Sequence, residues 1–126
     1  MEDVFRKLKF KHPGVIINSP TNLLAAFKKL GNKLTFDKNF KSNNTLVFVN
    51  DSKSLHAFLS TQLVNIEQDS IFWIAYPKGT SLVETDINRD IIRNSVEKYG
   101  IQTVSAISID ETWSALRFRP IDKVGK

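Results

Sequence analysis

Two uninterrupted apolar segments constrain the fold of this chain more than any other feature. Residues 46–49 and 71–76 consist of apolar side chains only and are rich in β-branched and aromatic types. A strand with one face in solvent would alternate polar and apolar residues, and neither segment does so. Both segments are therefore predicted to be strands that are buried on both faces.

A third apolar run, residues 15–17, is shorter and ends at a polar turn. Leucine and phenylalanine then recur at helical spacing, with Ser19 as the predicted N-cap and Pro20 at the first helical position. Gly31 is predicted to end this helix, because glycine adopts the left-handed backbone of helix ends at little cost. The run therefore predicts a short strand that feeds a helix.

Two further helices are predicted from the same apolar spacing. One follows Asp51, and the other follows Asp86 and stops at Gly100. Residues 34–36 form a marginal strand candidate between the first helix and residues 46–49. Helices thus alternate with buried strands along most of the chain, which is typical of a parallel sheet with right-handed crossovers.

The C-terminal part of the chain alternates polar and apolar residues. Residues 103–109 and 113–119 both show this period of two, and a short polar stretch separates them. The pattern predicts an antiparallel hairpin. Together these elements predict an α/β fold: a three-layer, doubly wound, mostly parallel Rossmann-like sheet that ends in the hairpin.

A chain of 126 residues, 41% of them hydrophobic, can bury one core without covalent staples. We therefore predict a single domain over residues 1–126, with mobile arms at residues 1–10 and 120–126. The absence of cysteine excludes disulfides, thiolate catalysis and zinc sites built on sulfur. The first residues carry scattered charges and no long apolar run, so a cytoplasmic protein without a membrane contact is expected.

The formal net charge of +5 admits nucleic acid among the partners. The basic residues are spread over the N-terminal arm, the first helix and the C-terminus, and this spread favours a solvated surface. Nucleic acid is therefore only weakly supported as a partner, and the oligomeric state is not indicated.

Three motifs resemble an uncharacterised bacterial family of small domains. They are Tyr76-Pro77-Lys78, the Thr-Asp-Ile-Asn-Arg-Asp sequence at residues 85–90, and the Asp-Glu-Thr-Trp-Ser-Ala-Leu-Arg-Phe sequence at residues 110–118. Members of this family look like shortened class I methyltransferases, in which an antiparallel hairpin follows the doubly wound strands. The resemblance implies a methyltransferase-like strand order and no activity.

The turn after the first strand departs from the pattern of cofactor-binding enzymes. Such enzymes have a glycine-rich turn there, because missing side chains let the backbone approach the ligand. Residues 18–22 contain no glycine, so side chains and a proline ring occupy that place. Asp37 is the acid that would hold a ribose at the end of the marginal strand. No cofactor is predicted.

Ligands of open parallel sheets bind at the carboxyl ends of the strands, where the strand order reverses. With a methyltransferase-like order, the loops after residues 15–17 and 71–76 would lie side by side there. Lys78 and the free amides of the first helix would attract an anion such as phosphate, although Ser19 and Lys78 fit a plain cap and a solvated loop equally well. The predicted ligand-binding residues are Asn18, Ser19, Thr21, Asp51, Tyr76 and Lys78.

Two other groups of side chains are predicted to contact an anion or a partner protein. The third helix opens with an excess of polar groups, although its arginine could instead pair with Asp86 or Asp90. The last strand carries an aromatic ring and arginines on one face, which could form a cation–π strip or cover a neighbouring element. The residues concerned are Asn88, Arg89, Trp113 and Arg117.

The chain offers few groups for catalysis. Its two histidines, His12 and His56, cannot supply a triad or a metal site by themselves, so no catalytic or metal-binding residue is predicted. The function class that fits best is a non-catalytic methyltransferase-like module that binds a small anionic ligand or a protein partner. The alternatives are an S-adenosylmethionine- or nucleotide-dependent transferase and a nucleic-acid-binding protein.

Overall fold

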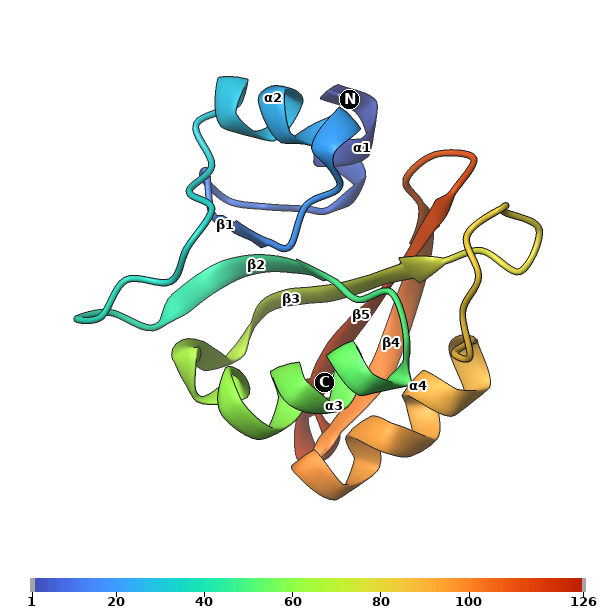
Figure 1. Cartoon of the computed structure of the whole chain (residues 1–126). Helices are drawn as coiled ribbons and strands as arrows, with labels where there is room; N and C mark the ends of the chain where they lie inside the picture. Colours follow the sequence, from blue (N-terminus) through green and yellow to red (C-terminus); the bar gives the residue numbers. More distant parts are fainter. Residues whose placement is uncertain (1, 126) are drawn as a thin grey trace.

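The computed structural model describes residues 2–125, and its centre is a five-stranded sheet in the order β1-β2-β3-β5-β4 (Figure 1). The strands are β1 (Val15–Ile17), β2 (Ser42–Phe48), β3 (Ile66–Pro77), β4 (Ile101–Ser108) and β5 (Trp113–Pro120). The helices are α1 (Glu2–Lys7), α2 (Thr21–Lys29), α3 (Ser52–Thr61) and α4 (Arg89–Val96), with 3-10 turns at Leu63–Asn65, Glu97–Tyr99 and Ile121–Lys123.

The sheet is mixed, so the predicted doubly wound, mostly parallel, Rossmann-like sheet is wrong. β1 and β3 each pair with β2 in parallel, whereas β5 pairs antiparallel with both β3 and β4. The parallel part is small because β1 has only three residues. The predicted strand at residues 34–36 is wrong too, since the chain there forms only a single parallel bridge between Lys33 and Val15.

Side chains of the central strands alternate between two apolar clusters, one on each face of the sheet. At the end of β2, Leu46 and Phe48 join the cluster under α1 and α2, while Val47 and Val49 join the cluster under α3 and α4. Figure 1 shows these helix pairs on opposite sides of the sheet. Burial on both faces is confirmed, and it explains why these strands carry no polar alternation.

The first residues of α3 fit the sequence prediction, and those of α2 do not. Asp51 caps α3: its Oδ1 accepts from the backbone N–H of Ser54 at 2.8 Å, and the Ser54 hydroxyl accepts from the backbone N–H of Asp51 at 3.2 Å. Ser19 does not cap α2. Its hydroxyl donates to the Pro20 carbonyl oxygen at 3.0 Å, and Pro20 itself occupies the cap position.

α4 begins later than the sequence suggested. Asn88, rather than Asp86, is the N-cap, and its Oδ1 accepts from the backbone N–H of Ile91 at 2.9 Å. Gly100 ends the following 3-10 turn with a left-handed φ of 79°, as predicted for a helix stop. Because Asn88 is the cap, Asp86 is available for a different contact, a hydrogen bond from the backbone N–H of Ser52.

The N-terminal residues, expected to form a mobile arm, form α1 and cover part of the sheet. Leu8 is fully buried. The indole N–H of Trp73, in the middle of β3, donates to the Leu8 carbonyl oxygen at 2.9 Å. This bond joins residues that are 65 positions apart in the chain, so it holds the N-terminal segment against the centre of the sheet.

The chain enters β1 through a close backbone contact at Gly14. The Gly14 N–H donates to Oδ1 of Asn32 at 2.8 Å, and the amide of Asn32 donates to the Phe27 carbonyl oxygen at 3.0 Å. Gly14 lies so near to β2 that an added Cβ would overlap the carbonyl oxygen of Asn44. Glycine is therefore required by space at this position, and its φ is not in the left-handed region.

A salt bridge joins the distorted start of β3 to β5. Arg119 donates from Nε to Oδ1 of Asp69 at 2.9 Å and from a terminal nitrogen to Oδ2 at 3.1 Å. Asp69 has a left-handed φ of 53°. The hydrogen bond from Arg119 lowers the pKa of Asp69 below its usual value of 3.8 and raises that of Arg119.

This pKa shift predicts a small, acid-sensitive contribution to stability. A carboxylate whose pKa is lower in the folded state stabilises the fold above its unfolded pKa, and the stabilisation is lost as the pH falls through the folded value. Asp69→Asn should therefore lower the urea midpoint at pH 6 and leave it nearly unchanged at pH 2 relative to wild type. Glu67→Gln is the matched control. Equal differences for Asp69→Asn at both pH values would contradict the assignment.

Candidate functional site

The order of the strands divides the predicted ligand-binding residues into two groups. The predicted crevice needed the loops after β1 and β3 to be neighbours, but β2 lies between these strands. Asn18, Ser19 and Thr21 therefore stay with β1, away from Tyr76 and Lys78 at the end of β3. The single crevice predicted from the methyltransferase-like order is wrong.

The second group meets residues of α4 at the carboxyl end of β3. A cleft of about 450 Å³ is lined by seven residues, four of which were predicted as contact residues: Tyr76, Lys78, Asn88 and Arg89, together with Gly79, Asp90 and Ser114. We call it the Lys78–Arg89 cleft. A shallow hollow of about 720 Å³ adjoins it, shares Lys78 and Asn88, and reaches Asp51 at the start of α3.

Lys78 is held in place by the turn of the β4–β5 hairpin. Its backbone N–H donates to the Thr112 carbonyl oxygen at 2.7 Å, and its Nζ donates to the hydroxyl of Ser108 at 2.6 Å. An ammonium group has three donors, so two remain for a ligand. The hairpin therefore positions a positive charge at the edge of the cleft.

Arg89 is the first residue of α4 and lies exposed beside Lys78. Among residues 2–125 its guanidinium forms no ion pair and no hydrogen bond, so the alternative pairing with Asp86 or Asp90 is not formed. Asp86 is engaged elsewhere: its Oδ1 accepts from the backbone N–H of Ser52 at 2.7 Å. All five guanidinium donors of Arg89 are open to an acceptor.

The neighbouring acids serve structural roles. Asp86 ties the loop before α4 to the start of α3, and the hydroxyl of Thr85 reinforces this tie by donating to the Asn50 carbonyl oxygen at 2.6 Å. Hydrogen bonds from Ser54 hold the pKa of Asp51 below its usual value, as expected for a helix cap. Among residues 2–125, the Lys78–Arg89 cleft is lined by two cationic side chains and one acid, Asp90, while the adjoining hollow is lined by Asp51, Glu84 and Asp86.

Two residues predicted for the last strand lie outside this cleft. Trp113 is buried in the core, where its ring meets that of Phe48 edge to face with centroids 5.0 Å apart. Its predicted contact with a ligand is therefore wrong, because the ring does not reach solvent. Arg117 is half-buried beside Trp73, and its Nε has no hydrogen-bond partner.

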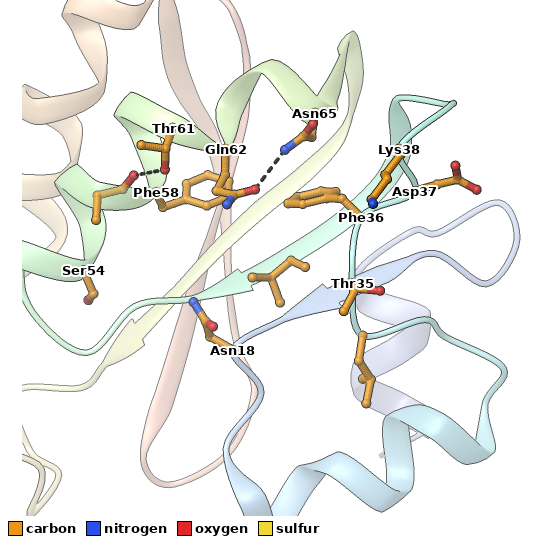
Figure 2. Close-up of a pocket in the computed structure, with 13 residues that line it drawn as sticks. Asn18, Thr35, Phe36, Asp37, Lys38, Ser54, Phe58, Thr61, Gln62 and Asn65 are labelled. Atoms are coloured by element: carbon orange, nitrogen blue, oxygen red, sulfur yellow. Dashed lines mark hydrogen bonds between the residues drawn. The ribbon is translucent and has the colours of Figure 1, made fainter.

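The remaining predicted residues lie near a groove that the sequence did not reveal (Figure 2). The groove has a volume of about 620 Å³ and runs between α3 and residues 34–38, with Phe36 and Phe58 between its polar rims. Asn18 lines it, whereas Ser19 and Thr21 do not. Asp37 lines it too, but its carboxylate points away in Figure 2 and accepts from the backbone N–H of Asn39 at 2.7 Å.

The part of the chain that the structure describes contains no cluster of histidine and acidic side chains that could hold a metal ion. None of its helices combines the length and the apolar character needed to cross a membrane. Comparison with known proteins found no matching family model, no similar curated protein and no similar solved structure. The resemblance to an uncharacterised bacterial family therefore stays a prediction.

Proposed function

We propose that the protein is a binding domain and that the Lys78–Arg89 cleft holds a small anion, carried as a phosphate or carboxylate group. The observation behind this proposal is that the open guanidinium of Arg89 and the hairpin-held ammonium of Lys78 belong to residues that line the same cleft. Both groups lie at the carboxyl end of β3 and at the first turn of α4, whose backbone amides also favour negative charge.

The residues that line the cleft support binding rather than catalysis. A hydrolytic or transfer site needs a nucleophile within reach of a general base. The hydroxyls at the cleft belong to Tyr76 and Ser114, and within residues 2–125 neither forms a hydrogen bond with Asp90, the carboxylate of the cleft, while neither histidine lines it. The donors Lys78, Asn88 and Arg89 instead suit an acceptor group that is held and not transformed.

A cofactor-dependent transferase has less support. That function would gather Asn18, Asp37 and Tyr76 around one adenosyl-sized pocket. The groove beside α3 holds Asn18 and Asp37, but the carboxylate of Asp37 points away from it. Tyr76 lies in the other cleft, at the end of β3.

Arg89→Gln tests the proposal because it removes the charge and keeps a polar side chain of similar length. We expect calorimetric titration with phosphate, sulfate and citrate in low-salt buffer to show binding of at least one anion. The dissociation constant should rise about 10-fold or more in the variant, which is the usual effect of losing a charged hydrogen bond. Lys78→Gln should weaken the same anion.

Arg93→Gln is the matched control, because Arg93 lies one turn further along α4 and does not line the cleft. It should bind the anion as wild type does. Equal weakening by Arg89→Gln and Arg93→Gln would indicate a general charge effect and contradict a site at the cleft. Absence of binding for all three anions would also contradict it.

A further inference from the structure

The positive charge of the chain is concentrated in its first third. Residues 1–41 contain nine lysines and arginines against three acidic residues, whereas residues 42–126 contain nine against ten. The excess of positive charge therefore arises entirely before β2. The basic residues were predicted to be spread over a solvated surface, but the net positive charge is confined to the first part of the chain.

The fold places this basic third on one side of the molecule. β1 and the loop from α2 to β2 lie at one edge of the sheet, whereas α1 and α2 cover one of its faces, and Leu8 after α1 reaches the centre (Figure 1). The loop before β2 projects beyond the sheet in this view.

A pocket of about 240 Å³ lies within this side of the molecule. It is lined by His12, Lys33, Phe40, Lys41 and Asn43, among others, and Asp37 is the only acid on its wall among residues 2–125. Its far wall is fixed, because Nδ1 of His12 lies 2.8 Å from the Pro13 carbonyl oxygen and Nε2 lies 3.0 Å from the amide nitrogen of Asn44. The pocket is thus a formed hollow with positive charge around it.

Phe40 stands out because its side chain is 74% exposed. It lies between Lys38 and Lys41 in the sequence and beside Lys33 at the pocket. Within residues 2–125, none of these three lysines forms an ion pair. Lys33 and Lys41 line the same pocket as Phe40, whereas Lys38 lines the groove beside α3. An exposed aromatic ring in a pocket with two lysines contributes nothing to the core, and it suits a ligand that offers both a flat apolar face and negative charge.

We propose that Lys33, Phe40 and Lys41, called the Phe40 surface below, bind single-stranded nucleic acid. Unpaired bases stack on exposed aromatic rings whatever their sequence, and nearby lysines neutralise the phosphates of the same strand. The bases of a duplex are already stacked and paired, so a duplex would use the lysines alone. The Phe40 surface is separate from the Lys78–Arg89 cleft, and each proposal stands or fails without the other.

The test measures fluorescence anisotropy of labelled single-stranded DNA and RNA of about 12 nucleotides, a length within the usual range for one small domain. Wild-type protein should bind both at low salt. Phe40→Ala should raise the dissociation constant about 5-fold or more, the usual effect of losing one stacked base. Replacing Lys33 and Lys41 by glutamine should reduce the slope of log K against log salt by about 0.7 per lysine.

Control variants match each change at a site outside the Phe40 surface. Val64→Ala removes another exposed apolar side chain, and Lys123→Gln removes another exposed lysine, and both should bind as wild type. Weakening by the controls equal to that of Phe40→Ala would overturn the proposal. Binding of a duplex or of inorganic polyphosphate as tight as that of the single strand, and insensitive to Phe40→Ala, would overturn it as well.

Discussion

Replacing Gly14 by alanine should lower the free energy of unfolding by roughly 3 kcal/mol or more, at the upper end of the range for overpacked sites. The added Cβ would overlap the carbonyl oxygen of Asn44, and its other near neighbours also belong to Asn44. Backbone atoms cannot rotate away as a flexible side chain can. The entry to β1 would have to move away from β2, and the hydrogen bond from Gly14 to Asn32 would be lost with it.

Gly79→Ala separates this steric effect from the general effect of replacing glycine. No atom outside its chain neighbours lies within 4 Å of a Cβ added at Gly79, and its φ is not left-handed. Urea unfolding followed by circular dichroism should therefore give a stability within about 0.5 kcal/mol of wild type for this variant. Similar losses for Gly14→Ala and Gly79→Ala would contradict the close backbone contact described at β1.

Trp73→Ala is expected to cost roughly 3 to 5 kcal/mol, the usual range for removing a large buried aromatic side chain. Trp73 is 1% exposed at the centre of β3. Trp73→Phe keeps most of the apolar contact but removes the indole N–H, so the buried Leu8 carbonyl oxygen loses its donor. We expect this variant to lose about 1 to 3 kcal/mol.

Phe40→Ala provides the comparison for both tryptophan variants. Its exposed ring contributes to no buried cluster, so the free energy of unfolding should change by less than about 0.5 kcal/mol. The three variants are measured by the same urea titration. Trp73→Phe as stable as wild type would show that the bond between Trp73 and Leu8 does not hold the N-terminal segment in place.

Local features of this fold follow from local sequence. The apolar runs at residues 46–49 and 71–76 predict buried strands, because a strand that is buried on both faces carries apolar residues at successive positions. Asp51 predicts the start of α3, since its carboxylate needs only the next three residues to form the capping box. Such features depend on neighbours within one turn, and sequence patterns capture them.

The arrangement of the strands could not be predicted in this way. The strand order depends on the pairing of β5, the second strand of the hairpin, with β3. The alternation of polar and apolar residues in the hairpin does not indicate which strand lies beside it. Leu34 and Phe36 have strand-like residue types, yet the chain there finds no continuous ladder to join. Residues with high β-propensity form a strand only where a neighbouring strand is available to pair with them.

The candidate site was predictable in part for the same reason. Lys78 was predicted in one group of contact residues and Asn88 and Arg89 in another, and the fold brings the end of β3 and the start of α4 together in one cleft. The separation of Asn18 from Tyr76 follows from strand order, which was predicted wrongly. Phe40 gave no periodic signal, because its importance lies in exposure, and exposure is a property of the folded surface.

The brevity of β1 has a consequence for how the basic side of the molecule responds to a ligand. Three residues at the rim of the sheet give few ladder bonds, so we expect the loop that carries Phe40 to open locally before the central strands do. A nucleic acid that binds only the closed form would oppose this opening by an amount set by its concentration relative to its dissociation constant. Occupancy of the Phe40 surface and protection of the loop from local opening would therefore rise together.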